Sequence, residues 1–181
     1  MIDEVKSILV SEEEINDTVS RLAAEISRDY NGRRLLLLCT LKGAVVFMGD
    51  LMKRVTIPVE IDFMKVSSYG NATVSSGGVN ILLDLHRNDL ADVDILVIED
   101  IIDSGRTLSY LVEYLKLKGA RSVKTATMLD KPERRVVDFT PDYVGKVIPD
   151  EFVVGYGLDY AERFRALPYI GILKPEVYEN N

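Results

Sequence analysis

One stretch of the sequence decides the fold, residues 95–108, which read Ile95-Leu96-Val97-Ile98-Glu99-Asp100-Ile101-Ile102-Asp103-Ser104-Gly105-Arg106-Thr107-Leu108. Its first part is an apolar run typical of a strand buried on both faces, and further apolar residues follow at helical spacing at Leu108, Leu111 and Leu115. The stretch therefore predicts a parallel strand that leads into a helix. Acidic and small residues lie between the two, at the carboxyl end of the strand, where open α/β sheets bind ligands.

The acidic and the small residues of this stretch favour ligands of opposite character. The backbone N–H groups of residues 104–107, at the start of a helix, would bind an anion such as phosphate. The carboxylates of Glu99, Asp100 and Asp103 would repel that anion, but they would accept hydrogen bonds from hydroxyl groups. A phosphorylated sugar meets both requirements. A helix cap is the simpler alternative, although a cap needs only one of these side chains.

The segment Glu99-Asp100-Ile101-Ile102-Asp103-Ser104-Gly105 resembles the phosphoribosyl-diphosphate-binding motif of the type I phosphoribosyltransferases. It is most similar to the hypoxanthine-guanine branch, whose motif reads Glu-Asp-Ile-Ile-Asp-Thr/Ser-Gly. The resemblance implies an α/β, single-domain phosphoribosyltransferase fold over residues 1–181. That fold is a mainly parallel twisted sheet flanked by helices, with a small hood and a flexible lid loop. The implied activity is transfer of a phosphoribosyl group to hypoxanthine or guanine in purine salvage.

Three further segments resemble the parts of the family that bind phosphoribosyl diphosphate. Leu41-Lys42-Gly43-Ala44 is similar to the Leu-Lys-Gly-Gly of the diphosphate loop and departs from it only at Ala44; Lys42 by itself could equally be a solvated surface lysine. Ser68-Tyr69 opens a loop of small and polar residues and resembles the Ser-Tyr of the lid, the alternative being a surface tyrosine. Arg165 matches a second diphosphate-binding cation. The implied set is Lys42, Gly43, Ser68, Tyr69, Glu99, Asp100, Asp103, Ser104, Gly105, Arg106, Thr107 and Arg165.

The base-binding part of the family is matched by Lys131-Pro132 and by Phe152-Val153-Val154-Gly155-Tyr156-Gly157-Leu158-Asp159-Tyr160. The resemblance implies that Lys131 binds the 6-oxo group of a purine, that Phe152 stacks on the ring and that the Val153 backbone meets its edge. Asp159 is the fourth residue of the implied purine-binding set. Without the family, Phe152 beside two valines would be expected in the core.

The resemblance also assigns chemical roles to four acidic residues. It implies that Mg²⁺ is the cofactor, with Glu99, Asp100 and Asp159 as metal ligands. It implies that Asp103 is the catalytic residue and takes the proton from the imidazole ring of the purine. The implied substrates are phosphoribosyl diphosphate and a 6-oxopurine base, and the implied assembly is a homodimer or homotetramer.

Composition narrows the class of protein. A length of 181 residues, of which 47% are hydrophobic, suits one domain with a substantial core. The formal net charge of −7 opposes nucleic acid as a partner. The single cysteine, Cys39, excludes an intrachain disulfide and is expected in the core. Because no signal segment follows Met1 and no apolar run is long enough to span a bilayer, we expect a cytoplasmic protein without a membrane partner.

The remaining sequence predicts alternating helices and strands. Ser11 and Glu14 have the spacing of a capping box that starts a helix, which we expect to end near Asp29. A second helix is expected over 45–54, and the turn-rich loop is expected over 67–78. Such alternation predicts a largely parallel sheet with helices on both faces. Strands are expected over 35–40, 59–63, 95–102, 123–129, 143–148, 152–154 and 169–173.

Two alternatives to a hypoxanthine-guanine phosphoribosyltransferase stay open. The first is a regulatory RNA-binding protein built on the same fold, which would need a basic face. The second is a relative of the enzyme that prefers xanthine. Other classes are excluded: His86 is the single histidine, which leaves no His-rich metal site, and Gly155-Tyr156-Gly157 lacks the third glycine of a dinucleotide-binding fingerprint.

Overall fold

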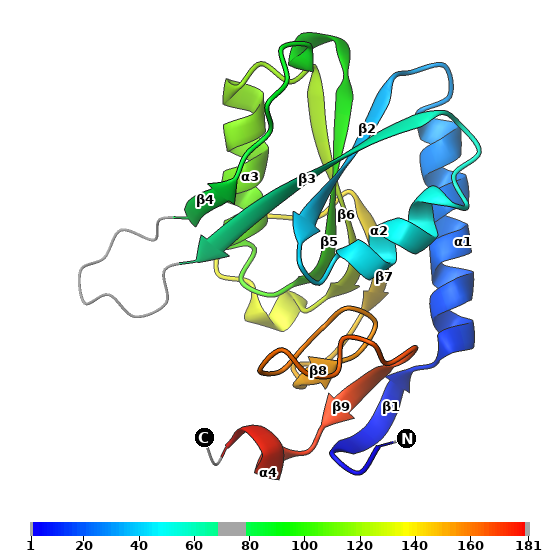
Figure 1. Ribbon diagram of the computed structural model, residues 1–181, viewed down its shortest axis with the longest axis vertical. Coiled ribbons are helices and arrows are strands. Elements are labelled where there is room, and N and C mark those ends of the chain that lie inside the picture. The colour runs from blue at the N-terminus through cyan, green and yellow to red at the C-terminus, as the bar shows by residue number, and fades with distance from the viewer. Residues whose placement is uncertain (1, 69–78, 180–181) are drawn as a thin grey trace.

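The computed structural model describes residues 2–68 and 79–179, with only the backbone of Ser68 (Figure 1). The helices are α1 (Glu12–Asp29), α2 (Val45–Met52), α3 (Arg106–Leu117) and α4 (Pro175–Tyr178). The strands are β1 (Val5–Val10), β2 (Leu35–Leu41), β3 (Val59–Ser68), β4 (Val79–Leu83), β5 (Asp94–Ile102), β6 (Ser122–Asp130), β7 (Tyr143–Val147), β8 (Val153–Val154) and β9 (Ile170–Leu173).

The main sheet has six strands in the order β4-β3-β2-β5-β6-β7. All neighbouring strands run parallel except β4, which pairs antiparallel with β3. This confirms the largely parallel sheet predicted from the sequence. Because β2, β5 and β6 run in the same direction, the loops that follow their carboxyl ends meet at one edge of the sheet, where the expected site residues lie.

Two hydrophobic cores cover the two faces of this sheet. Leu35, Leu37 and Cys39 of β2 point to the face covered by α1 and α2. Leu36 and Leu38 point to the opposite face, which α3 covers. Side chains alternate across a strand, so a continuous apolar run can serve both cores. The structure thus confirms helices on both faces and a buried Cys39.

The start of α1 has the capping box expected from the sequence. The hydroxyl of Ser11 accepts a hydrogen bond from the backbone N–H of Glu14 at 3.2 Å. In return, the Glu14 carboxylate accepts one from the backbone N–H of Ser11 at 2.9 Å. Each bond satisfies a donor that the first helical turn leaves free.

A second, smaller sheet forms the hood. Its strands run antiparallel in the order β1-β9-β8. Figure 1 shows it beyond the end of the main sheet to which the arrowheads of β5 and β7 point. The sequence did not predict β1, because its apolar residues become buried only when β9, more than 150 residues later in the chain, pairs with it. The hood carries residues 152–165 to the ligand-binding edge.

Two expected boundaries were wrong, and one further strand was not predicted. Ser67, expected at the start of the loop, belongs to β3, which continues through Ser68. Strand β4, not predicted from the sequence, pairs antiparallel with that extension of β3. Helix α2 ends at Met52 instead of Arg54. No helix within the described ranges is long and apolar enough to cross a membrane.

Candidate active site

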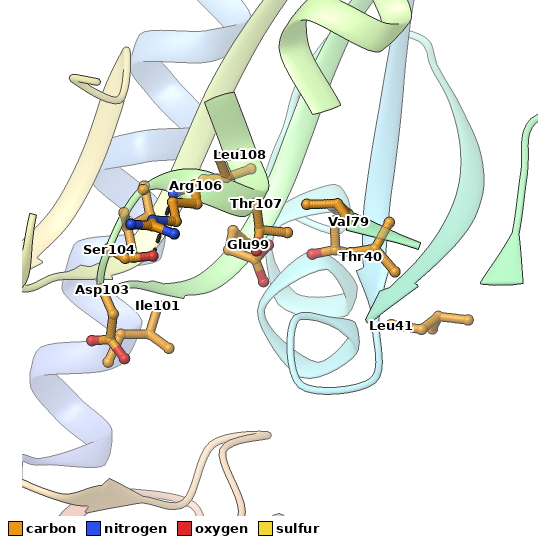
Figure 2. A pocket seen from close by; sticks show the side chains of 13 residues that line it. Thr40, Leu41, Val79, Glu99, Ile101, Asp103, Ser104, Arg106, Thr107 and Leu108 are labelled. Atoms are coloured by element: carbon orange, nitrogen blue, oxygen red, sulfur yellow. Dashed lines mark hydrogen bonds between the residues drawn. The ribbon is translucent and has the colours of Figure 1, made fainter. Parts of the chain in front are cut away.

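The first half of the site is a cavity of about 410 Å³ above the turn from β5 into α3. Its lining includes Glu99 and residues 103–107. Because we expect these five residues to bind a phosphate, we call them the phosphate-binding turn. Gly105 precedes α3 with φ of 78°, a left-handed conformation that favours glycine. Thr40, Glu99 and Thr107 all line this cavity (Figure 2). The first-turn amides of α3 have no carbonyl partner within the helix, so the turn has the form of an anion site.

Glu99 lines this cavity, and its carboxylate lies beside that of Asp100. Burial and the neighbouring Asp100 carboxylate raise the pKa of Glu99 well above its usual value. Burial likewise raises the pKa of Asp100. A cation or a set of hydroxyl donors placed against them would favour their ionised forms. The pair is therefore suited to receive a metal ion or a polyol.

The loop after β2 packs directly on Asp100. A Cβ atom added to Gly43 would collide with the Asp100 carboxylate, so this close approach requires glycine. A Cβ at Gly157 would collide in turn with the backbone of Gly43. Ala44, where the family motif has a second glycine, has φ of −64° and is buried. Alanine adopts that conformation without strain, so the departure from the motif costs the loop nothing.

Arg135, which sequence reasoning missed, forms hydrogen bonds that hold the phosphate-binding turn in place. The guanidinium of Arg135 donates to the backbone carbonyl of Asp103 at 2.5 Å and also pairs with Asp130. The backbone N–H of Val136 donates to the carbonyl of Ser104 at 3.1 Å. Arg135 thus connects the end of β6 to the turn after β5.

The second half of the site is another cavity of about 410 Å³, between the turn and the hood. It shares two residues with the first cavity, Ile101 and Asp103. In Figure 2 the side chains of both point away from Thr107. The remaining lining consists of Lys131, Arg134, Asp150, Glu151, Phe152, Val153, Leu158, Asp159 and Tyr178. The structure therefore brings all four residues expected to bind the base into one cavity.

An aromatic surface stands at one side of this second cavity. Phe152 is 37% exposed, so the expectation of a core residue, made without the family, was wrong. Its ring stacks on Tyr178 of α4, with centroids 4.7 Å apart, and meets Tyr160 edge to face at 5.5 Å. Val153 is buried and pairs with Ile172, which fixes the backbone beside the ring. Sequence reasoning missed Tyr178, because a tyrosine near the end of the chain carries no local signal.

Lys131 is the buried cation of the same cavity. It follows β6 and has a 9% exposed side chain. Its ammonium nitrogen lies 3.7 Å from the carboxylate of Asp103 and 3.9 Å from that of Asp150. A lysine ammonium group has three N–H donors and no acceptor. Lys131 can therefore donate hydrogen bonds into the cavity but cannot accept them.

The two cations expected at the diphosphate lie together, next to acidic residues. The ammonium of Lys42 is 2.8 Å from Glu162. Arg165 is 2.8 Å from Asp159 and 3.3 Å from Glu162, and its Nη1 donates to the carbonyl of Gly157. Its Nε is buried and has no hydrogen-bond partner among the described residues. Sequence reasoning missed Glu162, which meets both cations only in the folded chain.

The three expected magnesium ligands do not form a complete metal site by themselves. Within the described ranges, no three Asp, Glu, His or Cys side chains gather at one metal point. Magnesium, however, is usually held by one or two carboxylates together with substrate phosphates and water. Glu99 lines the first cavity and Asp159 the second, and together with the neighbouring Asp100 they supply hard oxygen donors that fit that mode. Tyr69 and the expected lid lie outside the described residues, as does the side chain of Ser68.

Known proteins resemble the chain over nearly its whole length. The phosphoribosyl transferase domain model matches residues 7–161. The hypoxanthine-guanine phosphoribosyltransferase of Bacillus subtilis is 54% identical over 180 residues, which cover 99% of each chain. A crystal structure of a Staphylococcus aureus hypoxanthine phosphoribosyltransferase superposes with a TM-score of 0.92 at 48% identity, covering 97% of this chain and 95% of that one.

A longer relative contains the same unit. The bifunctional protein TilS/HprT of Listeria monocytogenes is 57% identical over 178 residues, 98% of this chain but 27% of that protein. The chain thus spans about a quarter of the length of that relative. Both the family model and the near-complete similarity at more than half identity lead to one conclusion: this chain belongs to the phosphoribosyl transferase family, in its hypoxanthine-guanine branch.

Proposed function

We propose that this chain transfers the 5-phosphoribosyl group of phosphoribosyl diphosphate to hypoxanthine or guanine, giving IMP or GMP and diphosphate. One observation carries the proposal: the anion-binding cavity and the base cavity share Ile101 and Asp103. A sugar phosphate in the first cavity and a flat base in the second would meet at Asp103. The reaction joins those two parts.

The sugar phosphate is bound by the turn after β5. The backbone amides of residues 104–107 and the α3 dipole hold the 5-phosphate. Hydroxyl groups of the ribose donate to Glu99 and Asp100, whose pKa values are raised chiefly by burial and would fall once such donors are bound. Gly43 lets the loop after β2 approach the Asp100 carboxylate closely.

The leaving diphosphate gains negative charge as its bond to the anomeric carbon breaks. Lys42 and Arg165 stabilise that charge, and the free Nε of Arg165 is a further donor. When bound, magnesium supplies additional charge neutralisation, held by Asp159 and by the Glu99–Asp100 pair together with substrate oxygens. A lid that includes Ser68 and Tyr69 excludes water from the carbon centre.

The purine is oriented by three residues and loses a proton to a fourth. Phe152 stacks on the ring, the Val153 backbone meets its edge, and Lys131 donates to the 6-oxo group. As an imidazole nitrogen forms the bond to the anomeric carbon, Asp103 accepts the proton of that ring. Asp103 lines both cavities and so reaches the point where the bond forms.

The experiment that tests this function is a rate measurement with hypoxanthine, guanine, xanthine and adenine as acceptors of the phosphoribosyl group. Transfer to hypoxanthine and guanine is expected, without transfer to adenine. A preference for xanthine would support the xanthine alternative. If none of the four bases is used and the chain instead retains RNA in a filter-binding assay, the regulatory alternative replaces the enzyme.

We also propose the domain organisation, the assembly and the location of this enzyme. Residues 1–181 form a single catalytic domain that assembles as a homodimer or homotetramer and works in the cytoplasm. The acidic net charge of −7 supports small-molecule substrates over nucleic acid. Size-exclusion chromatography with light scattering would measure the assembly.

A further inference from the structure

The chain places its own carboxylate where the diphosphate of the substrate is proposed to bind. Lys42 follows β2 and Arg165 follows the hood strand β8, yet both contact Glu162. One carboxylate oxygen is 2.8 Å from the Lys42 ammonium, and the other is 3.3 Å from the Arg165 guanidinium. A single side chain therefore spans the two cations in the way that a bridging oxyanion would.

The backbone holds Glu162 in this position. Tyr160 and Arg163 form an isolated antiparallel bridge, and Glu162 lies in the turn between them. Its φ is 62°, in the left-handed region, and its N–H donates to Asp159 at 2.9 Å. Non-glycine residues persist in that region when the surrounding contacts require it. The turn thus directs the Glu162 side chain toward the two cations.

Glu162 pairs with both cations, but these ion pairs are weak enough for a more highly charged ligand to displace the Glu162 carboxylate. Lys42 and Glu162 have side chains 51% and 66% exposed. Exposed ion pairs contribute little because water screens both charges. The Glu162 carboxylate reaches both cations, one oxygen to each. Diphosphate brings more charge and more oxygen atoms than one carboxylate.

We propose that Glu162 is an internal competitor at the leaving-group subsite, an inference that rests on the proposed function. In the free chain it neutralises Lys42 and Arg165 and keeps them in place. Diphosphate, or the diphosphate end of the substrate, displaces it. When diphosphate leaves, Glu162 pairs again with Lys42 and Arg165. This competition lowers the affinity of the chain for diphosphate. Its charge, rather than its size, sets the affinity of the subsite.

The test is calorimetric titration of inorganic diphosphate, with magnesium present, into the unmodified chain and the Glu162→Gln variant. Removing the competing charge should tighten diphosphate binding by about twofold to thirtyfold, which corresponds to two exposed ion pairs. The KM for phosphoribosyl diphosphate should fall in parallel, while the KM for hypoxanthine should not change.

Two further variants control for the substitution itself. Glu113→Gln is the matched control, because Glu113 is 65% exposed and pairs with Lys116 at 2.8 Å on α3, outside both cavities; it should leave diphosphate affinity unchanged. Glu162→Asp retains the charge and should stay closer to the unmodified chain than Glu162→Gln. If Glu162→Gln binds diphosphate with equal or lower affinity, the inference is wrong. If the unmodified chain binds no diphosphate, the proposed function itself is contradicted.

Discussion

The ammonium nitrogen of Lys131 lies 3.7 Å from a carboxylate oxygen of Asp103. The lysine side chain is 9% exposed and the aspartate side chain 48% exposed, so the pair connects the buried wall of the base cavity with its open side. The residue expected to recognise the 6-oxo group therefore adjoins the residue expected to accept the proton. The proposed recognition of the base and the proposed proton transfer would therefore be linked at this contact.

Asp103→Asn should slow the chemical step while preserving binding of the sugar phosphate. The amide cannot take a proton, so kcat should fall by ~10²–10⁴-fold. The KM for phosphoribosyl diphosphate should change little, because backbone amides of residues 104–107 hold the phosphate. Single-turnover kinetics would measure the step directly, and an unchanged kcat would remove Asp103 from the proton transfer.

Gly43→Ala should damage the site without unfolding the chain. The added methyl group collides with the Asp100 carboxylate, so the loop and the carboxylate must separate. We expect kcat/KM for phosphoribosyl diphosphate to fall by about 10²-fold, since misplaced groups of this kind cost that much.

Gly49→Ala is the matched control for this substitution. A Cβ at Gly49 meets no atom within 4 Å, and the residue lies within α2. It should leave activity unchanged and stabilise the chain by roughly 0.5–1 kcal/mol, because alanine favours a helix over glycine. Equal activity of both alanine variants would contradict the close approach of Gly43 and Asp100.

Arg135→Lys tests whether the hydrogen bond from Arg135 to the Asp103 carbonyl positions the phosphate-binding turn. Lysine keeps a positive charge near Asp130 but lacks the planar fork that reaches Asp130 and the Asp103 carbonyl together. The KM for phosphoribosyl diphosphate should rise by about tenfold, the equivalent of one hydrogen bond of ~1.4 kcal/mol. The KM for hypoxanthine should stay the same, and an equal rise in both constants would indicate general damage instead of a local effect on the turn.

Removal of magnesium with a chelator should abolish transfer. The diphosphate would then face Glu99, Asp100 and Asp159 without a compensating divalent charge. Readdition of magnesium should restore the rate. A parallel measurement with calcium, which tolerates irregular coordination, shows whether transfer depends on the octahedral geometry that magnesium prefers. Full turnover in the chelator would contradict the assigned role of the three carboxylates.

The parts of the fold that the sequence predicted are those whose pattern is local. The apolar run before Glu99 and the Ser11 capping box identify β5 and α1, because burial and capping leave periodic or short-range signals. Strands β1 and β4 were missed, since β1 pairs only with β9, far along the chain, and β4 pairs only with β3 at the edge of the main sheet. Local patterns do not encode that pairing.

The same distinction holds for the site. Residues 99–107, Lys131 and Phe152 could be chosen because they stand in recognisable motifs. Arg135, Glu162 and Tyr178 could not, since each takes its place through a contact with a residue remote in the chain. The sequence predicted the groups expected to contact substrate, and the structure adds the groups that hold or compete with them.

The most direct test of the central claim compares hypoxanthine with adenine in the unmodified chain and in Lys131→Ala. Lys131 only donates hydrogen bonds, so it suits a 6-oxo group and leaves a 6-amino group unpaired, at a cost of roughly 1–3 kcal/mol for each buried group. Polar discrimination of this kind can reach ~10⁴-fold. The measurement is kcat/KM for both bases in both proteins. The account predicts strong preference for hypoxanthine in the unmodified chain and a much smaller preference after the substitution; comparable use of adenine by the unmodified chain, or an undiminished preference in Lys131→Ala, would contradict it.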